Sequence, residues 1–284
     1  MFTLLLKRHL RLYFRDRASV FFSLLGVIII MLLYILFLGN MLEGAAEEFA
    51  SDNARFIMDS WIMAGVIAVA SITTAMGAFG IAVNDKEKHI LKDFQVSPIK
   101  RTTLLTSYIV ATAIVGFVMS VLVLVFAEIY IVMYGGEWLS FSALLKTIGL
   151  IALAVISSTS LVFFIITMIK TQNAFGTASS LMGTLIGFLT GIYIPIGQLP
   201  SSIQTVIKIF PLSHAVVLMR QVMMGEALSV DAMPDQFVSF MGLRFTVGDS
   251  FMEPWIHIFV LVAATIIFFM ASLFVLNRKD QAVI

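Results

Sequence analysis

Long apolar runs alternate with short polar stretches along this chain. A helix needs about 20 mostly apolar residues to cross the roughly 30 Å hydrocarbon core of a bilayer, and several runs reach that length. Each run is predicted to be helical, because a helix satisfies its own backbone inside lipid and the alternating pattern of a barrel is absent. The predicted spans are residues 20–38, 62–83, 104–126, 144–168, 175–194 and 255–276.

Composition supports the same class of fold. Hydrophobic residues make up 60% of the chain and charged residues 12%, whereas an ordinary soluble domain carries about 25% charge. The chain has no cysteine, which excludes disulfides and thiolate metal ligands. A cleaved signal peptide is the alternative for the N-terminus, but its apolar core should hold only about 7–15 residues, so we expect the first run to be a span.

The distribution of Lys and Arg predicts the orientation. Thirteen of the eighteen fall on the side of the termini, and cytoplasmic loops carry the excess of these residues. We therefore expect a multi-pass protein of the bacterial plasma membrane with both termini cytoplasmic. The first outer loop is acidic and is interpreted as a solvated surface; its acids are Glu43, Glu47, Glu48, Asp52 and Asp59.

A basic stripe precedes the first span. Lys7, Arg11 and Arg15 recur at intervals of four beside apolar residues, a pattern typical of a helix that lies in the membrane interface. We assign residues 1–19 to this interfacial helix. Anchoring by anionic lipid and contact with a partner protein are both compatible with the stripe.

The charged segment "NDKEKHILKDFQVSPIKR" separates the second and third spans. It is longer than a compact connection requires, and we assign residues 84–103 to a cytoplasmic loop with a function. Ile90, Leu91 and Phe94 form the apolar face of a short helix that Pro98 ends. So short a helix is unstable alone, so it must dock on the protein's own helix ends or on a cytoplasmic partner.

The region after the fifth span is broken but still apolar. Pro195, Gly197 and Pro200 interrupt the helix, and two apolar pieces too short to span follow. We predict that residues 195–254 form an outer region with re-entrant helices, whose irregular backbone is covered by protein or lines a cavity.

Two of these stretches together resemble one family, the ABC transporter permeases of the type-two export class. In the charged loop, Lys86 and Glu87 stand at the family's Arg-Glu, followed by Leu91, Ser97, Pro98 and Arg101; the match departs at His89, where the family usually has glycine. The second match lies around the end of the fifth span, at Gly191, Pro195, Leu199, Pro200, Pro211 and Leu212.

The resemblance implies that the charged loop is a coupling helix pressed into a separate ATP-binding subunit. Two such subunits would bind ATP and Mg and work with two permease chains, the same or related. A second cytoplasmic contact would be residues 169–175. The implied ATPase contacts are Lys86, Glu87, Lys88, Leu91, Phe94, Ser97, Pro98 and Arg101.

The residues themselves point away from chemistry in this chain. No Gly-x-x-x-x-Gly-Lys followed by Ser or Thr occurs, so any ATP must be bound by another chain. No nucleophile motif occurs either, so we expect no enzyme activity. We also expect no nucleic-acid partner. The four histidines, His9, His89, His214 and His257, form no pair in the sequence, and no metal site is expected.

Charge inside the spans is sparse. Glu128 is expected near the interface and Arg220 in the re-entrant region, where it could pair or reach water. An ion-driven pump places working carboxylates inside the membrane, so their scarcity favours an external energy source. The scattered Met residues favour packing over a copper relay.

The sequence therefore predicts an all-α membrane protein with six spans, an N-terminal interfacial helix, a coupling helix and outer re-entrant helices in one permease domain, residues 1–284. We expect a dimer in which small residues of the second and fifth spans face a partner chain. Its cargo would be an apolar or amphipathic drug, lipid-linked molecule or hydrophobic peptide. The expected path residues are Thr73, Met76, Phe79, Phe188 and Tyr193, with Ile194, Pro195 and Leu199 as the outer gate.

Two other functions compete with this hypothesis. A membrane scaffold or sensor would use the charged loop as a docking platform and would not couple a cargo to hydrolysis. A channel is the third alternative, but no selectivity-filter motif occurs.

Overall fold

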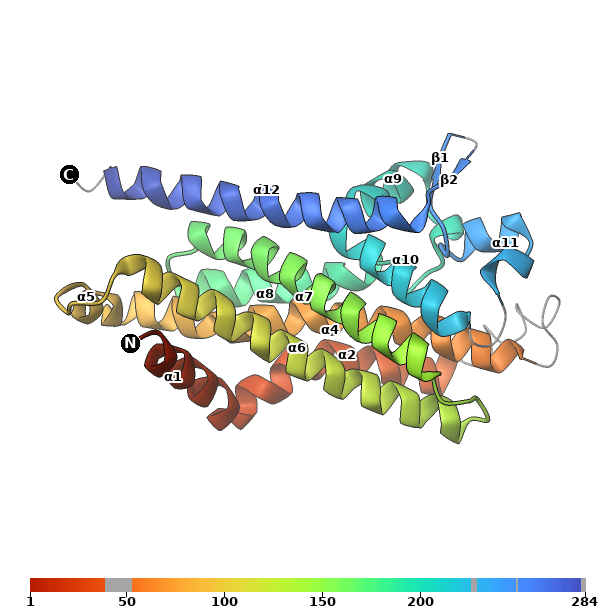
Figure 1. Ribbon diagram of the computed structural model, residues 1–284, viewed down its shortest axis with the longest axis horizontal. Coiled ribbons are helices and arrows are strands. Elements are labelled where there is room, and N and C mark those ends of the chain that lie inside the picture. Colours follow the sequence, from red (N-terminus) through yellow and green to blue (C-terminus); the bar gives the residue numbers. More distant parts are fainter. Residues whose placement is uncertain (39–52, 226–228, 249, 282–284) are drawn as a thin grey trace.

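The computed structural model describes residues 1–38, 53–225, 229–248 and 250–281. They form an elongated bundle in which the long helices run side by side (Figure 1). The long elements are α1 (Phe2–Arg15), α2 (Arg17–Leu33) with the π-helical turn η1 (Tyr34–Leu38), α4 (Ala54–Glu87), α6 (Arg101–Met133), α7 (Phe141–Met168), α8 (Gln172–Leu189) and α12 (Pro254–Gln281).

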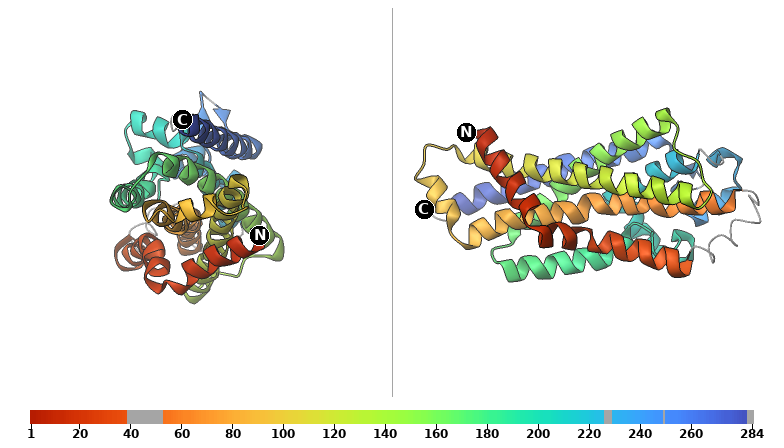
Figure 2. Two further views of the ribbon diagram at one scale, coloured as in Figure 1. Left: turned by 90° about the vertical axis from the view of Figure 1, so that its left-hand side faces the viewer. Right: turned by 90° about the horizontal axis from the view of Figure 1, so that it is seen from below.

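Shorter elements lie at both ends of the bundle. Helix α5 (Ile90–Gln95) lies at one end with α1 and the last turns of α12 (Figures 1 and 2). The other end carries η2 (Ile196–Gln198), α9 (Ser201–Ile209), η3 (Val230–Ala232), α11 (Asp235–Phe240) and the antiparallel strands β1 (Thr246–Val247) and β2 (Ser250–Phe251), while α10 (Pro211–Met224) runs back between the long helices. Placing α1, α5 and the end of α12 together agrees with both termini lying on one side.

The class of fold predicted from the sequence is confirmed, but one of the six predicted spans is not among the candidate spans of the structure. Five helices are long and apolar enough to cross a membrane: residues Arg17–Phe37, α4, α6, α7 and residues Pro254–Arg278. The pair α9 and α10, bent by 87°, would make a sixth if it counts as one span. Helix α8, the predicted fifth span, is not among them, because it opens on Gln172 and Asn173 and is rich in Gly, Ser and Thr.

The fifth span also ends earlier than predicted, at Leu189 instead of residue 194. Gly191 adopts a left-handed φ of +63°, and its amide donates to the carbonyl of Phe188 at 3.1 Å. The amide of Ile192 donates to the carbonyl of Gly187 at 3.0 Å. These two bonds form a Schellman cap, which ends the helix before any of the prolines is reached.

Helix α4 is the centre of the bundle and is longer than predicted at both ends. It packs against α2, α6, α7, α8 and α10, and its first half is almost completely buried. Its 34 residues correspond to about 51 Å. Asp59, predicted in the outer acidic loop, lies within α4 and is buried, whereas the other four predicted acids of that loop lie outside the described residues.

Two further boundaries need correction. The interfacial helix ends at Arg15 instead of residue 19, because Asp16 leaves the helical conformation and caps α2, accepting from the Ser19 amide at 3.2 Å and hydroxyl at 2.8 Å. The charged loop is shorter than residues 84–103, since α4 continues to Glu87 and α6 begins at Arg101. His89, with φ +61°, makes the turn into α5.

In the outer region, α10 is buried among α4, α7 and α12, while α9 leaves the apolar side chains of Ile203, Val206 and Ile209 exposed. This pair has the bend that the prolines predict, and the depth at which it enters a membrane stays a prediction.

Candidate coupling and transport site

Helix α5 docks on its own chain. Leu91 and Phe94 pack against the main core, and the guanidinium of Arg8 lies over the Phe94 ring at 5.6 Å from its centroid. The Ser97 hydroxyl donates to the carbonyl of Phe94 at 2.7 Å and closes the helix before Pro98. The apolar face that the sequence predicted is therefore turned inward, away from any cytoplasmic partner.

The opposite face of this segment is exposed. It presents Lys88, Lys92, Asp93 and Pro98, and Val96 has 89% of its surface exposed. Arg101, another predicted contact, is also exposed, at the first turn of α6. Sequence reasoning missed Val96, because a single apolar residue on a surface is no signal by itself. Its position on the exposed face of this segment is seen only in the structure.

Lys86 and Glu87 join two cytoplasmic segments of this chain. The Lys86 ammonium donates to the carbonyl of Ile169 at 2.6 Å, beyond the end of α7. The Gln172 amide, at the start of α8, donates to the Glu87 carboxylate at 3.3 Å. Because Lys86 serves a helix C-terminus and Glu87 a helix N-terminus, both charges also complement helix dipoles. Residues 169–175, the second predicted contact, are thus tied to the base of α5.

The interfacial helix α1 is held by an ion pair whose carboxylate is buried and whose guanidinium is partly exposed. Arg8 donates to both carboxylate oxygens of Asp85, at 2.7 and 3.1 Å, and the Tyr108 hydroxyl donates to Asp85 at 2.5 Å. Hydrogen bonding to Asp85 raises the pKa of Arg8. The predicted cations Lys7, Arg11 and Arg15 are exposed instead. The sequence offered one signal for this inner face, the spacing of Leu5, His9 and Tyr13, which are all buried.

His9 completes the contact between α1 and α6. Its Nε2 lies 3.0 Å from the Ser107 hydroxyl, and its ring stacks on Tyr108 with the centroids 3.9 Å apart. Burial, and then the neighbouring charge of Arg8, lower the pKa of His9 from 6.5 to about 4, while Asp85 opposes the shift.

Acid should therefore loosen α1. Between pH 6.5 and about 4, a detached α1 binds a proton at His9 that the docked helix does not bind, so docking weakens as the pH falls through this window. We expect faster hydrogen exchange across α1 at about pH 5 than at about pH 7.5, after correction for intrinsic rates. The variant His9→Gln should lose most of this difference, and an unchanged difference would contradict the role of His9.

The other end of α4 carries a second buried carboxylate. Arg55 donates to both oxygens of Asp59, at 3.0 and 3.1 Å, and the Tyr34 hydroxyl donates to Asp59 at 2.7 Å. Arg55 also donates to the Tyr130 hydroxyl at 3.0 Å. Nearby, the Glu128 carboxylate accepts from the amide of Leu139, in the connection between α6 and α7, at 3.0 Å. Glu128 is buried within the chain near the end of α6, and its depth in a membrane stays a prediction.

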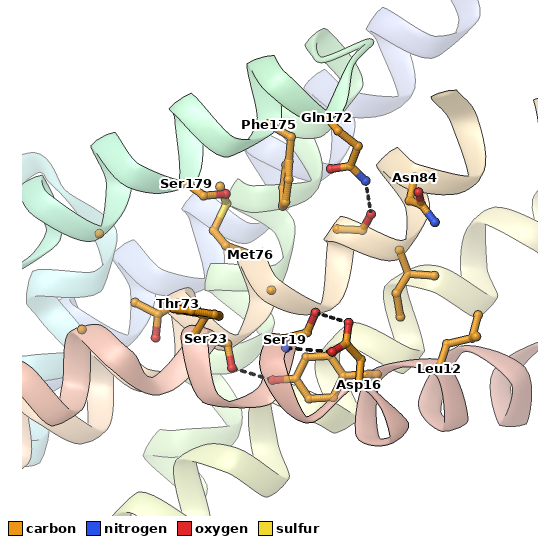
Figure 3. A pocket seen from close by; sticks show the side chains of 17 residues that line it. Leu12, Asp16, Ser19, Ser23, Thr73, Met76, Asn84, Gln172, Phe175 and Ser179 are labelled. Atoms are coloured by element: carbon orange, nitrogen blue, oxygen red, sulfur yellow. Dashed lines mark hydrogen bonds between the residues drawn. The ribbon is translucent and has the colours of Figure 1, made fainter. Parts of the chain in front are cut away.

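The five predicted path residues line three separate cavities. Thr73 and Met76 line a cavity of about 500 Å³ between α1, α2, α4 and α8, named here the α2/α4/α8 cavity (Figure 3). Phe79 lines a cavity of about 330 Å³ together with Leu91 and Phe94. Phe188 and Tyr193 line a third, of about 340 Å³, next to η1. The predicted single slot is therefore not formed within one chain.

Only one of the two helices predicted to face a second permease is free to do so. The small residues of α4 are used within the chain; a Cβ on Gly65, for example, would lie 2.5 Å from Ile192. On α8, a Cβ on Gly176 or Gly183 would meet nothing within 4 Å, whereas Gly187 is covered by Tyr193. The other small residues of these two spans include Ala68, Ser71 and Ala75 on α4 and Ser179 and Ser180 on α8.

The predicted gate residues lie between α8 and the outer helices. Pro195 is buried, Ile194 is partly exposed, and Leu199 packs on a small apolar cluster that includes Ile196 and Phe245. The movement of a gate here stays a prediction.

Arg220 ties the outer elements together. Only 2% of it is exposed, and it donates to the carbonyls of Gly191 at 2.9 Å, Met241 at 3.3 Å and Trp61 at 3.4 Å. Its guanidinium also lies 4.0 Å from the centroid of the Trp61 ring. The sequence left open whether Arg220 finds a partner inside the protein or reaches water. In the structure it finds partners, namely backbone carbonyls and the face of the Trp61 ring.

Two histidines that are far apart in the sequence meet in the structure. The Nδ1 atoms of His214 on α10 and His257 on α12 are 2.7 Å apart, and both rings are buried. The absence of a close pair in the sequence therefore does not exclude a pair in space, because this contact joins positions 43 residues apart. Among the described residues no group of three or more His, Asp or Glu is placed to hold a metal ion.

The structure has five or six apolar helices that are long enough to cross a membrane, with α4 at their centre. Together with the short helix α5 docked at one end, they define a multi-pass membrane protein. A family model described as ABC-2 type transporter matches residues 1–224, and the chain belongs to that family. The family comprises membrane-spanning permeases that pair with an ATP-binding subunit.

Two relatives are similar over one segment. Nodulation protein J of Rhizobium meliloti (strain 1021) is 33% identical over 92 residues, covering 32% of this chain and 34% of that protein. Nodulation protein J of Rhizobium leguminosarum bv. trifolii is 35% identical over 89 residues, covering 31% and 33%. The chain therefore spans about a third of the length of the curated relatives it matches.

Proposed function

We propose that this chain is the permease of an ATP-driven bacterial exporter for an apolar or amphipathic compound. It would work with a second permease chain and two ATP-binding subunits that carry ATP and Mg. The observation that supports the proposal is the two-sided build of the α5 segment. One side is anchored in the bundle through Leu91 and Phe94, and the other exposes Val96.

The contacts around α5 suggest how a movement would spread. A push on α5 acts on the end of α4 and, through Lys86 and Glu87, on the end of α7 and the start of α8. Since α4 is the central helix, these elements would shift together as a rigid body between inward-open and outward-open states. Nucleotide on the partner subunits would bias one of the two states.

The exposed face of α5 defines the test. We expect Val96→Asp to reduce co-purification of the ATP-binding subunit and ATPase activity in the complex by about tenfold or more, because it places a charge in an apolar contact. The fold should be unaffected, since Val96 is 89% exposed. The measurement is pull-down of the native complex in mild detergent, followed by an ATPase assay.

Val247→Asp is the matched control, because Val247 is 63% exposed in the hairpin at the opposite end of the bundle. It should leave both quantities unchanged. If Val96→Asp and Val247→Asp behave alike, the contact face is wrong. If no ATPase accompanies the native chain, the membrane scaffold becomes the better account.

A further inference from the structure

The α2/α4/α8 cavity combines apolar residues with a set of uncharged polar ones, which make up seven of the seventeen residues that line it (Figure 3). Its volume, about 500 Å³, is within the roughly 300–1,000 Å³ of small-ligand sites. Asp16 is the only charged residue among the described residues that line it. The uncharged polar lining consists of Tyr13, Ser19, Ser23, Thr73, Asn84, Gln172 and Ser179.

Several of these groups have hydrogen-bonding capacity to spare. The Ser179 hydroxyl oxygen is buried and has no partner among the described residues. The Thr73 hydroxyl donates to the Val69 carbonyl of its own helix at 3.2 Å, which leaves its lone pairs open. Buried polar atoms are almost always paired in proteins, so the unpaired Ser179 hydroxyl in this lining is open to a hydrogen-bonding occupant.

The charge of the lining sets the class of headgroup. A phosphate or carboxylate would find no Lys or Arg among the described lining residues and would be repelled by Asp16. Asp16 gives little attraction to a cation, because it is exposed to water and already accepts two hydrogen bonds from Ser19. Hydroxyl and amide groups complement an uncharged polar head best.

A second, apolar cavity lies further along the same helices. It has a volume of about 340 Å³ and is lined by Ile30, Leu33, Tyr34, Ile62, Phe188, Ile192 and Tyr193, from α2, η1, α4 and the end of α8. Along α4, Ile62 lies eleven residues, or about 16 Å, from Thr73. The same helices thus line one cavity with polar groups and, about 16 Å away along α4, one that is almost wholly apolar.

We infer that the two cavities together bind an amphiphile with an uncharged, hydroxyl-bearing headgroup, the head in the α2/α4/α8 cavity and the chain in the apolar one. This inference rests on the proposed export function for its biological meaning, and it narrows the cargo from any apolar compound to this class. Burial of the apolar chain supplies affinity, and the hydrogen bonds of the head supply selectivity.

The test is direct binding to the full chain in nanodiscs of zwitterionic lipid. The probe is a photoreactive dodecyl glucoside, with cross-linked peptides identified by mass spectrometry. We expect labelling of α4 and α8 that dodecyl glucoside suppresses at concentrations at least about tenfold below those of free glucose, dodecyl phosphate or dodecyltrimethylammonium. Equal suppression by the phosphate or the ammonium compound would overturn the headgroup assignment, and equal suppression by glucose would overturn the amphiphile.

Two variants test whether the headgroup of the probe lies in the α2/α4/α8 cavity. Thr73→Val should weaken labelling between about two- and tenfold through loss of a hydrogen-bonding group. Thr184→Val is the matched control, because the Thr184 hydroxyl also donates to its own helix, at 3.0 Å to Ser180, but lies outside the cavity. Ser179→Lys should improve competition by dodecyl phosphate about tenfold, a gain that misfolding cannot produce. If Thr73→Val matches its control, or Ser179→Lys gains nothing, the site is wrong.

The labelling experiment needs no ATPase. The proposed export function and the proposed amphiphile site can therefore be contradicted independently of each other. Specific labelling without an associated ATPase would remove the exporter and keep the binding site. An associated ATPase without specific labelling would keep the exporter and remove this class of cargo.

Discussion

Replacing Asp85 with alanine should detach α1 from the bundle. The substitution removes the carboxylate that binds Arg8 twice and accepts from Tyr108, and it leaves both donors without that acceptor. Breaking a fully buried ion pair costs about 3–5 kcal/mol. We expect about 2–4 kcal/mol here, because 31% of the Arg8 side chain is exposed. The measurements are the free energy of unfolding in mixed micelles and protease cleavage within α1.

Asp93→Ala is the control for this experiment. Asp93 lies eight positions further along the chain, on the exposed face of α5, so its removal should change stability by less than about 0.5 kcal/mol. Cleavage of α1 at the same rate in both variants would show that the ion pair does not hold the helix.

Replacing Arg220 with leucine should destabilise the outer half of the bundle by about 2–4 kcal/mol, because buried carbonyls lose their donor. The carbonyls concerned belong to Gly191, Met241 and Trp61, so the end of α8, the segment after α11 and α4 lose a common contact. The indole of Trp61 also loses the guanidinium stacked on it. Chemical unfolding followed by tryptophan fluorescence would report both changes.

Arg244→Leu offers the same chemical change at a more exposed place. Arg244 forms an ion pair with Asp231, whose side chain is 75% exposed, and such pairs contribute only about 0–1 kcal/mol. Equal losses for the two leucine variants would mean that the carbonyl contacts of Arg220 do not hold these elements together.

The spans, the short helix of the charged loop and the broken region after α8 could be predicted because each rests on a local signal. Apolar runs mark spans, and Ile90, Leu91 and Phe94 mark a helix face. The residues at which helices end were harder to predict from the sequence. Helix α4 continues to Glu87 since its charged residues bond to other segments, and α8 stops at Leu189 because Gly191 takes a left-handed conformation.

The site was predicted less well than the fold. Periodicity identified Phe94 as part of an apolar face, but it could not show that the face turns toward Arg8. The side-chain pairs that hold the bundle together are distant in the sequence. His214 and His257 are 43 positions apart, and Arg8 and Asp85 are 77 positions apart. A single sequence contains no local pattern for such contacts. Thr73 and Met76 line one cavity because they lie one turn apart on α4, whereas the other three predicted path residues line two other cavities.

The two carboxylates of α4 set a length scale for the membrane around this protein. Asp59 and Asp85 are 26 residues apart, which is about 39 Å along the helix. That length exceeds the hydrocarbon core of about 30 Å and approaches the 40–45 Å of a bilayer with its headgroups. Each ion pair would then lie in a headgroup layer, and a thinner or thicker bilayer must deform or tilt the helix to keep both there. The protein thereby carries a built-in preference for bilayer thickness.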